Sequence, residues 1–379
     1  MRLLYPLMWS RPDRKACRAQ TMGTVAALAR RGVETTLLMP RGPGDPVLTG
    51  AELADHFAVD GDFRLVQRES VWAGEALART LFWLRQVFRD PEIERADLLY
   101  SRIPAMLGMG GRSPVPFAVD HYRPWPDDLP VIRPLLRRTA ASPKCLGLVL
   151  HSAYAADAYR RAGVPDEKVL VAHNGAEPVR TGPPGDKAAA RARLGLEPDR
   201  FTAVYAGRVN AQKGLDQLLA LADLRPEVLF LLVGSEGEGP VETQARTRAN
   251  VRIVLWQAPA ALPAWLHAAD LLLIPPSLAP LAQFRTCVLP LKLFAYLAAG
   301  RPILAPDAPD IAELLTDGEN ALLVPPGDPA AAAAALDRLR DPALAARLGA
   351  AAYARSAALT WDARAEKIET FLRGRLSPG

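Results

Sequence analysis

Residues 202–224 read TAVYAGRVNAQKGLDQLLALADL, and they decide the fold of the chain around them. The apolar run at 202–206 is typical of a buried strand, and the Leu- and Ala-rich stretch 215–224 is typical of a helix. A strand, a short loop and a helix form the first part of a βαβ unit, in which a helix connects two parallel strands. The segment therefore predicts an α/β domain built on a parallel sheet.

Short apolar runs alternate with helix-length segments in both directions from this segment. The predicted helices 20–31 and 291–299 each end at a glycine, which is a helix stop signal. The Ala-rich residues 329–348 predict one further surface helix. The predicted strands are 2–7, 34–39, 62–66, 97–100, 116–120, 146–150 and 169–172, then 202–206, 228–233, 251–255, 271–274, 302–305 and 321–324.

The stretch PVRTGPPGD at 178–186 is rich in proline and glycine and separates the two sets of strands, so it predicts a linker. We therefore expect two Rossmann-like α/β domains, residues 1–178 and 187–360, facing each other across a cleft. Open α/β sheets bind ligands at the carboxyl ends of their strands, and both sets of ends would border that cleft. The amphipathic helix expected within 361–379 is predicted to return to the first domain.

The composition excludes several classes of protein. The 379 residues carry 46 basic and 41 acidic side chains, a net charge of +5, without a dense Lys/Arg tract that would indicate nucleic-acid binding. No apolar run approaches the roughly 20 residues that span a bilayer, so we expect a soluble cytoplasmic protein. The three cysteines, Cys17, Cys145 and Cys287, lack metal-ligand spacing. The Asp-x-Asp triplet at 60–62 precedes a strand, away from the expected cleft, so no metal site is predicted.

The loop after the strand 202–206 carries the residues of an anion site. Gly207 lets the backbone approach a ligand closely, Arg208 offers a planar fork to a phosphate, and Lys213 offers a point charge. The helix that follows adds the positive end of its dipole. Together they predict a diphosphate site without a metal. The alternative is a basic loop that merely starts a helix.

A second candidate segment is LPLKLFAYLAAGRPILA at 289–305, preceded by QFRTC at 283–287. A helix start next to a guanidinium, a hydroxyl and backbone amides could hold a phosphate and a sugar. A loop packed under a helix explains the same residues. The candidate donor-binding residues here are Phe284, Arg285, Thr286, Pro290, Leu291 and Lys292.

Several segments together resemble one known family. GRVNAQKG at 207–214, the block at 289–305 and DIAELLTDGENALLVPPGD at 310–328 resemble the C-terminal domain of the family 4 retaining glycosyltransferases, which have the GT-B fold. Residues 148–175 resemble the end of that family's N-terminal domain. The resemblance is weaker from residue 40 to 95.

The resemblance implies roles for particular residues. Arg208 and Lys213 would hold the diphosphate of a nucleotide-sugar donor. Asp120 and His121, at the end of a strand, would face the donor sugar across the cleft, and Arg102 would line the same wall. For His121 the alternative is a histidine whose hydrogen bonds are satisfied within the strand end.

The nucleotide side departs from the family in one respect. Trp256 and Gln257, in the loop LWQAP at 255–259, would contact the base. The family often carries two glutamates, the second of which binds the ribose hydroxyls, and the matching positions here are Cys287 and Ala295. Losing that carboxylate costs about 1.5–3 kcal/mol, which is roughly 10- to 150-fold in donor affinity.

The resemblance thus implies a retaining glycosyltransferase with no cofactor or metal. It would move a sugar from a nucleotide-diphosphate donor to an unidentified acceptor, which is a glycan, a lipid-linked compound or a small molecule. Two alternatives remain open: a nucleotide-sugar-binding protein with weak or no catalysis, indicated by Ala295, and an epimerase or phosphorylase of the same fold.

A helical stripe near residue 80 has two interpretations. Leu77, Leu81, Leu84 and Phe88 recur at helical spacing with arginines nearby. The stripe could dock on the inner face of a membrane or on a lipid-linked acceptor. The alternative is a helix that packs on its own sheet.

Overall fold

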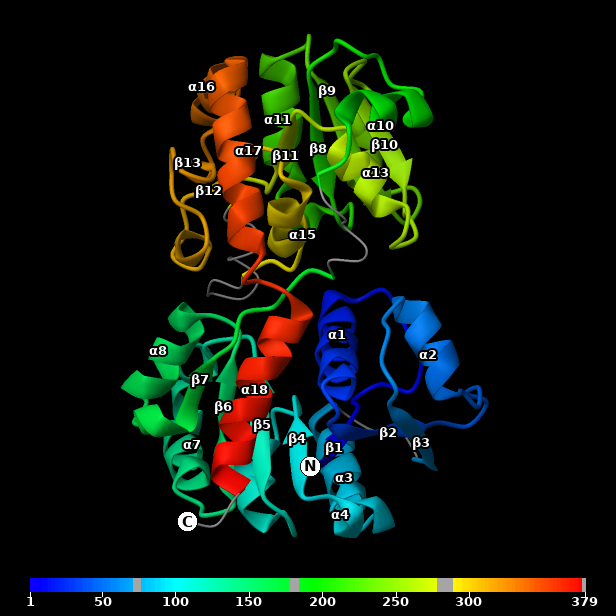
Figure 1. Ribbon diagram of the computed structural model, residues 1–379, viewed down its shortest axis with the longest axis vertical. Helices are drawn as coiled ribbons and strands as arrows, with labels where there is room; N and C mark the ends of the chain where they lie inside the picture. Colours follow the sequence, from blue (N-terminus) through cyan, green and yellow to red (C-terminus); the bar gives the residue numbers. More distant parts are fainter. Residues whose placement is uncertain (71–75, 178–183, 278–288, 377–379) are drawn as a thin grey trace. The chain divides into compact units, whose positions relative to one another are not determined.

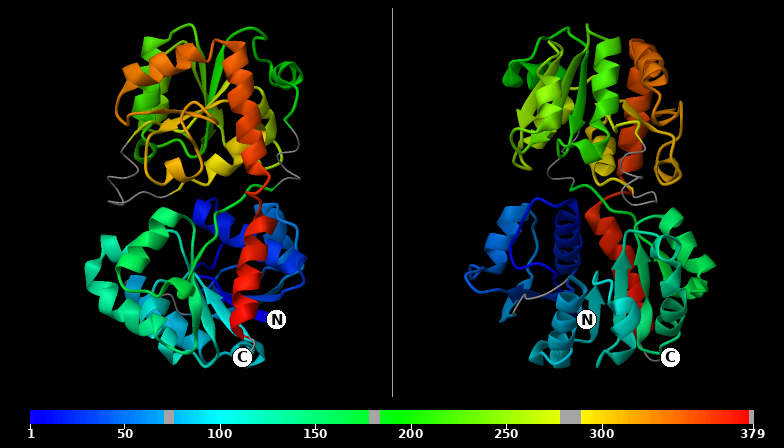
Figure 2. Two further views of the ribbon diagram at one scale, coloured as in Figure 1. Left: turned by 60° about the vertical axis from the view of Figure 1, so that its left-hand side comes forward. Right: turned by 180° about the vertical axis from the view of Figure 1, so that it is seen from behind.

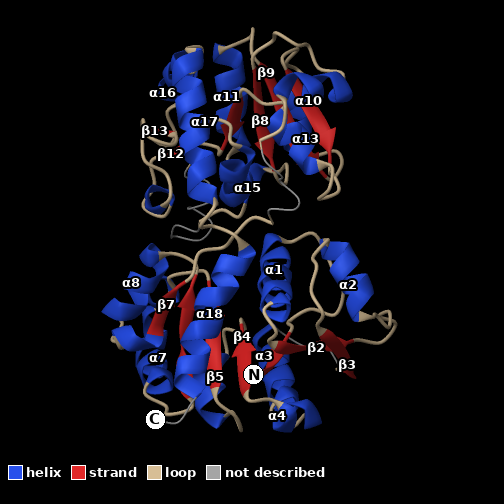
Figure 3. Cartoon of the chain, viewed as in Figure 1, coloured by secondary structure: helices blue, strands red, loops and turns tan. Residues whose placement is uncertain are grey.

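The computed structural model describes residues 1–70, 76–177, 184–277 and 289–376. The chain divides into two compact units. The N-terminal unit contains Met1–Asn174 and Trp361–Gly379, and the C-terminal unit contains Gly175–Thr360. In each unit, helices cover both faces of one sheet (Figures 1 and 3).

The N-terminal unit is built on a seven-stranded sheet in the order β3-β2-β1-β4-β5-β6-β7, and every paired strand runs parallel to its neighbour. The order reverses between β1 and β4, as in doubly wound folds. The central strands β4, β5 and β6 are buried throughout. The strands are β1 (Arg2–Pro6), β2 (Glu34–Arg41), β3 (Arg64–Glu69), β4 (Leu98–Ser101), β5 (Phe117–His121), β6 (Cys145–Leu150) and β7 (Val169–Val171).

The helices of this unit cover the two faces of the sheet (Figure 2). Several begin at a side-chain cap: the Thr49 hydroxyl accepts from the Glu52 N–H at the start of α2, and the Ser152 hydroxyl accepts from the Ala155 N–H at the start of α8. The helices are α1 (Ala16–Arg30), α2 (Gly50–Phe57), α3 (Ala76–Val87), α4 (Pro91–Arg95), α5 (Met106–Met109), α6 (Trp125–Asp128), α7 (Arg133–Ala140) and α8 (Ala153–Arg161), with 3₁₀ turns η1 (Gly110–Arg112), η2 (Pro130–Ile132) and η3 (Asp166–Lys168).

The last helix, α18 (Trp361–Leu376), packs against α1 and β6 of the same unit (Figure 1). The two helices approach closely because α1 carries Gly23 at the contact. A Cβ atom at Gly23 would lie 2.5 Å from the Trp361 ring. The glycine therefore makes room for the indole that starts α18.

The C-terminal unit is built on a six-stranded parallel sheet in the order β10-β9-β8-β11-β12-β13, and the order reverses between β8 and β11. The strands are β8 (Thr202–Ala206), β9 (Leu229–Ser235), β10 (Val251–Leu255), β11 (Leu271–Leu273), β12 (Ile303–Pro306) and β13 (Leu322–Val324). The helices are α10 (Lys187–Leu194), α11 (Leu215–Leu224), α12 (Pro240–Ala245), α13 (Leu262–His267), α15 (Lys292–Ala299), α16 (Pro329–Arg338) and α17 (Pro342–Ser356), with 3₁₀ turns η4 (Ala211–Lys213) and η5 (Ile311–Glu313).

The strand β8 shows why the strand sequences are continuously apolar instead of alternating between apolar and polar residues. Val204 and Ala206 belong to the apolar cluster on one face of the sheet, and Ala203 and Tyr205 belong to the cluster on the other face. A parallel strand covered by helices on both faces buries every side chain.

Each of the thirteen apolar runs overlaps a strand, so the predicted fold class, two parallel α/β units, is confirmed. The single helix predicted over 329–348 is wrong, because α16 ends at Arg338 and a new helix, α17, begins at Pro342. The Asp341 carboxylate caps α17 by accepting from the Ala343 N–H at 2.9 Å. Along the chain, the boundary between the two units falls between Asn174 and Gly175. Residues 178–183 of the predicted linker lie outside the described residues.

Candidate functional site

The carboxyl end of β8 lies next to the point where the strand order reverses, which is where open α/β sheets bind ligands. Gly207 follows β8 with φ of +147°, a conformation that side chains with a Cβ rarely adopt. Its N–H donates to the Val233 carbonyl of β9 at 2.9 Å. A Cβ atom here would lie 2.9 Å from Lys292 Nζ and 3.1 Å from Tyr205 Oη. Gly207 therefore leaves room for an amine directly at the strand end.

Helix α15 brings Lys292 to this strand end. The Tyr296 hydroxyl accepts from the last N–H of β8 at 2.7 Å and donates to a carbonyl of β11 at 3.3 Å, so it fixes α15 above both strands. One turn earlier, Lys292 Nζ lies 3.5 Å from the centroid of the Tyr205 ring. Burial, and then the charge of Lys213, lowers the pKa of Lys292 well below its ordinary value.

Two further cations follow in the loop to α11. Arg208 is half-buried, and its Nε lies 3.7 Å from a carboxylate oxygen of Glu236. Lys213 is solvent-exposed and ends η4, and Gly214 follows in the left-handed region (φ +67°) to start α11. Partial desolvation, and then the charge of Arg208, lowers the pKa of Lys213.

Arg208, Lys213 and Lys292 thus concentrate positive charge at one strand end. Among the described residues, one carboxylate forms an ion pair with these three cations: Glu236, which contacts Arg208. Each lowered lysine pKa has a neighbouring cation among its causes. An anion bound here would relieve that repulsion, and the helix start of α11 adds backbone N–H groups. The arrangement fits a diphosphate.

The predicted base-binding loop follows β10. The Trp256 N–H donates to the Ser235 carbonyl of β9 at 2.8 Å, and the Gln257 side chain donates to the Leu255 carbonyl at 2.9 Å. Both side chains are half-buried. They lie at the same edge of the sheet as Gly207, with β9 between them.

The rest of the predicted donor site surrounds the start of α15. Pro290 and Leu291 are half-buried just before the helix. Ala295, one turn after Lys292, is half-buried and packs against the apolar cluster on its face of the sheet. The remaining predicted donor residues lie outside the described residues: Phe284, Arg285 and Thr286.

In the N-terminal unit, Asp120 is fully buried near the end of β5. Its Oδ2 accepts from Arg364 Nη2 and from the Tyr100 hydroxyl, each at 2.9 Å, and its Oδ1 accepts from His151 Nε2 at 2.6 Å. Burial alone would raise the pKa of Asp120, but Arg364 and His151 outweigh it and hold that pKa well below its ordinary value. A carboxylate satisfied in this way positions the strand end, and its contact with a sugar stays a prediction.

His121 is buried beside it and has one free ring nitrogen. Its Nδ1 lies 2.8 Å from the Tyr159 hydroxyl, whereas Nε2 has no hydrogen-bond partner among the described residues. Burial lowers the pKa of His121 to about 3 although Asp120 acts to raise it, so the ring is neutral near pH 7. An orphaned buried polar atom is costly, and a ligand oxygen at Nε2 would satisfy it.

Arg102 follows β4 and connects it to α1. Its Nη1 donates to the Cys17 carbonyl at 2.9 Å and to the Gln20 side chain, and its guanidinium lies 5.2 Å from the centroid of the Tyr122 ring. The side chain is half-buried. The structure therefore gathers Arg102, Asp120 and His121 around the carboxyl ends of β4 and β5.

Sequence reasoning missed the partners of these residues. Arg364 lies 244 positions from Asp120, and no local spacing connects the two. His151 and Tyr159 follow a different strand, and only the parallel order of β5 and β6 brings them near. Within the described residues, no group of three or more His, Cys, Asp or Glu side chains is arranged to hold a metal ion.

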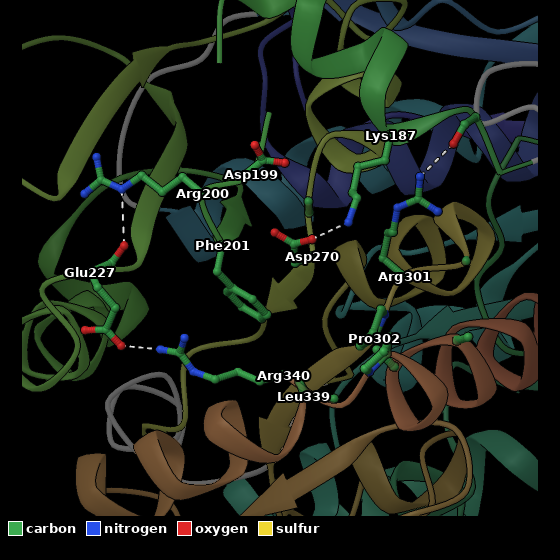
Figure 4. Close-up of a pocket in the computed structure, with 16 residues that line it drawn as sticks. Lys187, Asp199, Arg200, Phe201, Glu227, Asp270, Arg301, Pro302, Leu339 and Arg340 are labelled. Carbon is green, nitrogen blue, oxygen red and sulfur yellow. Dashed lines mark hydrogen bonds and ion pairs between the residues drawn. The ribbon is translucent and has the colours of Figure 1, made fainter. Parts of the chain in front are cut away.

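A cavity of about 810 Å³ lies elsewhere in the C-terminal unit, at the amino ends of its strands (Figure 4). Lys187 pairs with Asp270 at 2.6 Å, and Arg340 pairs with Glu227. Arg301 donates to backbone carbonyls, at 2.6 Å to that of Gly185. These charged side chains already have ion-pair or hydrogen-bond partners, and the cavity is at the opposite end of the sheet from Gly207.

Comparisons with known proteins agree with this geometry. Residues 20–180 match the family model described as Glycosyltransferase Family 4, and residues 200–341 match the one described as Glycosyl transferases group 1. The chain belongs to the family 4 glycosyltransferases. The predicted family is thereby confirmed.

Relatives and solved structures extend the comparison. D-inositol 3-phosphate glycosyltransferases are 33% identical over 217 residues in Streptomyces scabiei, covering 52% of this chain and 47% of that protein, and 33% identical over 213 residues in Frankia alni, covering 52% and 50%. The chain thus spans about half the length of the curated relatives it matches. Anabaena HepE, solved in complex with UDP-glucose, has a TM-score of 0.71 at 18% identity, covering 99% of this chain and 100% of that one. Sucrose-phosphate synthase from Thermosynechococcus elongatus has a TM-score of 0.76 at 19% identity, covering 98% of each. The structural matches confirm the GT-B fold.

Proposed function

We propose that this family 4 member transfers a sugar from a nucleotide-diphosphate donor to an acceptor, with retention of configuration and without a metal. Its C-terminal unit would bind the donor. The observation that carries the proposal is the grouping of Arg208, Lys213 and Lys292 around Gly207 at the carboxyl end of β8.

The charge at this site suits the leaving group. A departing nucleoside diphosphate gains negative charge as the glycosidic bond breaks, and preorganised cations stabilise that charge more than they stabilise the ground state. Arg208 would hold the diphosphate through its fork, and Lys213 and Lys292 through single amines. With this much positive charge supplied by side chains, a metal ion is not required for the electrostatic task.

One comparison supports a nucleotide sugar as the donor, because the HepE structure contains UDP-glucose. The curated relatives are named D-inositol 3-phosphate glycosyltransferases, which supports sugar transfer without specifying the donor. We propose UDP-sugars as the first donors to test. The acceptor is a glycan, a lipid-linked compound or a small molecule, and the chain would act in the cytoplasm, with peripheral contact to the membrane.

In the N-terminal unit, His121 Nε2 and Arg102 are proposed to contact the reacting sugar. A neutral His121 donates or accepts one hydrogen bond and does not compete with the diphosphate for its cations. No nucleophilic side chain is assigned. Retention would follow from attack on the face that the diphosphate leaves, with a phosphate oxygen taking the proton of the acceptor.

A thermal-shift screen with UDP, GDP, ADP and their sugars would identify the base. Titration calorimetry of Arg208→Ala and Lys213→Ala with the best nucleotide then tests the site. Each variant should lose about 10- to 150-fold in affinity, because each loses a charge-assisted contact. The control is Arg252→Ala, an exposed arginine on β10. Near-normal affinity in both site variants would refute the donor site.

Metal independence has its own test. Release of nucleoside diphosphate from the donor should be unchanged in EDTA. Loss of turnover in EDTA, restored by Mg²⁺ or Mn²⁺, would show that the leaving group is stabilised in another way.

A nucleotide-sugar-binding protein with weak or no catalysis is the second candidate, because Ala295 stands where the family places a ribose-binding glutamate. Binding of the nucleotide sugar without release of nucleoside diphosphate would favour it. Inversion or phosphorolysis of the sugar, rather than transfer to an acceptor, would indicate an epimerase or phosphorylase.

A further inference from the structure

Exposed apolar side chains gather on one surface of the N-terminal unit. Eight large apolar side chains are exposed in the described part of the chain. Four of them lie on three elements of this unit: one on α3, two in or just before η2, and one on α7. These are Phe82, Leu129, Val131 and Leu135, which are 52%, 47%, 77% and 44% exposed. Leu129 and Leu135 line one groove, and exposed apolar side chains around a groove mark an interaction site.

The patch borders an apolar groove of about 370 Å³. Nine residues line the groove, and each is an apolar residue or glycine. They belong to α3, to α5 and the two residues before it, to α6, and to the region of η2 and α7. Leu129 and Leu135 both line the groove and project to solvent. A Cβ atom on Gly108 would lie 2.8 Å from Leu135, so α5 and α7 meet at the groove floor. Among the lining side chains, Trp125 is the one that carries a hydrogen-bond donor, its indole N–H.

Two arginines flank the groove. Arg85 lies one helical turn after Leu81, which lines the groove, and Arg138 lies one turn after Leu135. Both arginines are exposed, and neither has an ion-pair partner among the described residues. The surface is therefore apolar at its centre and positive at its edge.

We propose that this surface docks the N-terminal unit on an anionic lipid bilayer. Leu129, Val131 and Leu135 would enter the interface between headgroups and acyl chains, while Arg85 and Arg138 would reach the headgroups. Because the groove lining is almost wholly apolar, the two arginines at its edge, rather than hydrogen bonds inside it, indicate the chemistry of the occupant. Mobile anionic headgroups need no fixed geometry, and they match two arginines that lack carboxylate partners.

This location differs from the stripe predicted from the sequence. Trp83 and Leu84 are fully buried, so most of the described part of α3 packs on its own sheet, and Leu77 lies outside the described side chains. Leu129 precedes η2 and Val131 lies within it, and neither belongs to the predicted stripe. The docking surface is centred there instead.

Docking at this surface would bring the bilayer near the residues proposed to contact the reacting sugar. Pro104, which lines the groove, lies two residues after Arg102, and Trp125, which also lines it, lies four residues after His121. A lipid-linked acceptor is the class that fits this proximity. The docking itself does not depend on the proposed transfer reaction.

Cosedimentation of the full chain with vesicles tests the docking. The chain should bind vesicles of phosphatidylcholine and phosphatidylglycerol, bind pure phosphatidylcholine less, and be released by salt. Val131→Asp should lower the partition coefficient by about tenfold or more. The matched control is Val47→Asp, which changes a valine 73% exposed in the same unit and should bind as the unaltered chain does.

The arginines are tested by Arg85→Gln with Arg138→Gln. This double variant should lose the preference for phosphatidylglycerol, whereas the exposed pair Arg338→Gln with Arg355→Gln in the C-terminal unit should keep it. Absence of vesicle binding, or equal binding by the variants at Val131 and Val47, would overturn the proposal. So would a dimer that Val131→Asp dissociates, because a second copy would then cover the groove. Nucleotide titration of the same variants keeps failure here separate from failure of the donor site.

Discussion

Arg364 and Asp120 form an ion pair in which neither side chain is exposed, with 2.9 Å between Nη2 and Oδ2. Arg364 lies on α18, after the chain has passed through the whole C-terminal unit, and Asp120 lies on β5 beside His121. Arg364 also donates to the Ala172 carbonyl and to the Thr24 hydroxyl. One guanidinium thus joins α18, α1, β5 and the segment after β7.

The first prediction concerns the stability that this pair provides. Arg364→Ala should lower the free energy of unfolding of the N-terminal unit by about 3–5 kcal/mol, because it leaves a buried carboxylate unpaired. The control is Asp362→Ala on the same helix, whose pair with Arg30 is 50% exposed on the aspartate side and should contribute about 0–1 kcal/mol. Urea denaturation measures both. Equal small losses in the two variants would mean that Asp120 is not held by Arg364.

The second prediction is an acid-sensitive N-terminal unit. Burial lowers the pKa of His121 and of His151 to about 3, against 6.5 when unfolded. Between those values the unfolded chain binds protons that the folded chain does not, so stability falls as the pH falls below about 6.5, by up to about 1.4 kcal/mol per pH unit for each histidine. Asp120, whose pKa is held well below its unfolded value, adds a loss of the same sign below about pH 4.

Urea midpoints measured from about pH 7 to pH 4.5 test this dependence. His121→Gln should remove about half of the slope in that range, because His151 supplies the other half. A flat profile, or a slope unchanged in His121→Gln, would show that the ring is not held neutral by burial.

The fold was readable from the sequence because its causes are local. Parallel strands covered on both faces appear as short apolar runs, and β8 and α11 were predicted at their observed bounds. The break between α16 and α17 was missed although Asp341-Pro342 is a helix-start signal, because the alanine-rich segments on both sides of it were read as one helical stretch. Local composition is a weak guide where good helix formers stand on both sides of a cap.

The site was readable only where its residues follow one strand. Gly207, Arg208 and Lys213 lie within one loop and drew attention through their chemistry. The contact of Lys292 with Tyr205 depends on how α15 crosses the end of β8, which the sequence does not specify. The network of Asp120 likewise depends on α18, which returns from the far end of the chain.

The third prediction tests whether Gly207 serves the ligand site or the backbone alone. Gly207→Ala should cost about 1–3 kcal/mol of stability for its φ of +147° and should also displace Lys292, whose Nζ would lie 2.9 Å from the new Cβ. Gly237→Ala is the matched control, because Gly237 has φ of +143° and a Cβ added there would meet no atom within 4 Å. Calorimetry should show about tenfold weaker nucleotide binding in Gly207→Ala, the loss of one charge-assisted contact, and none in the control. Equal affinities would remove Lys292 from the donor site.

The fourth prediction is that Ala295→Glu tightens nucleotide binding. Ala295 is half-buried on α15, one turn after Lys292, at the position where the family carries a carboxylate. Charge-assisted hydrogen bonds to the two ribose hydroxyls would add about 1.5–3 kcal/mol, which is roughly 10- to 150-fold in affinity. Ala295→Gln separates charge from size, since the amide fills the same space with weaker acceptors.

A competing effect of the new carboxylate must be distinguished from the expected one. Glu at position 295 would stand three residues after Lys292 on one helix face, and such a pair interacts. If the carboxylate binds the ribose, a nucleoside monophosphate gains affinity as the diphosphate does, because both carry the same hydroxyls. If it captures Lys292 instead, the diphosphate loses a cation and binds more weakly, while the monophosphate changes little. Calorimetric titration of the three proteins with both nucleotides decides between these outcomes, and the second would place the ribose away from α15.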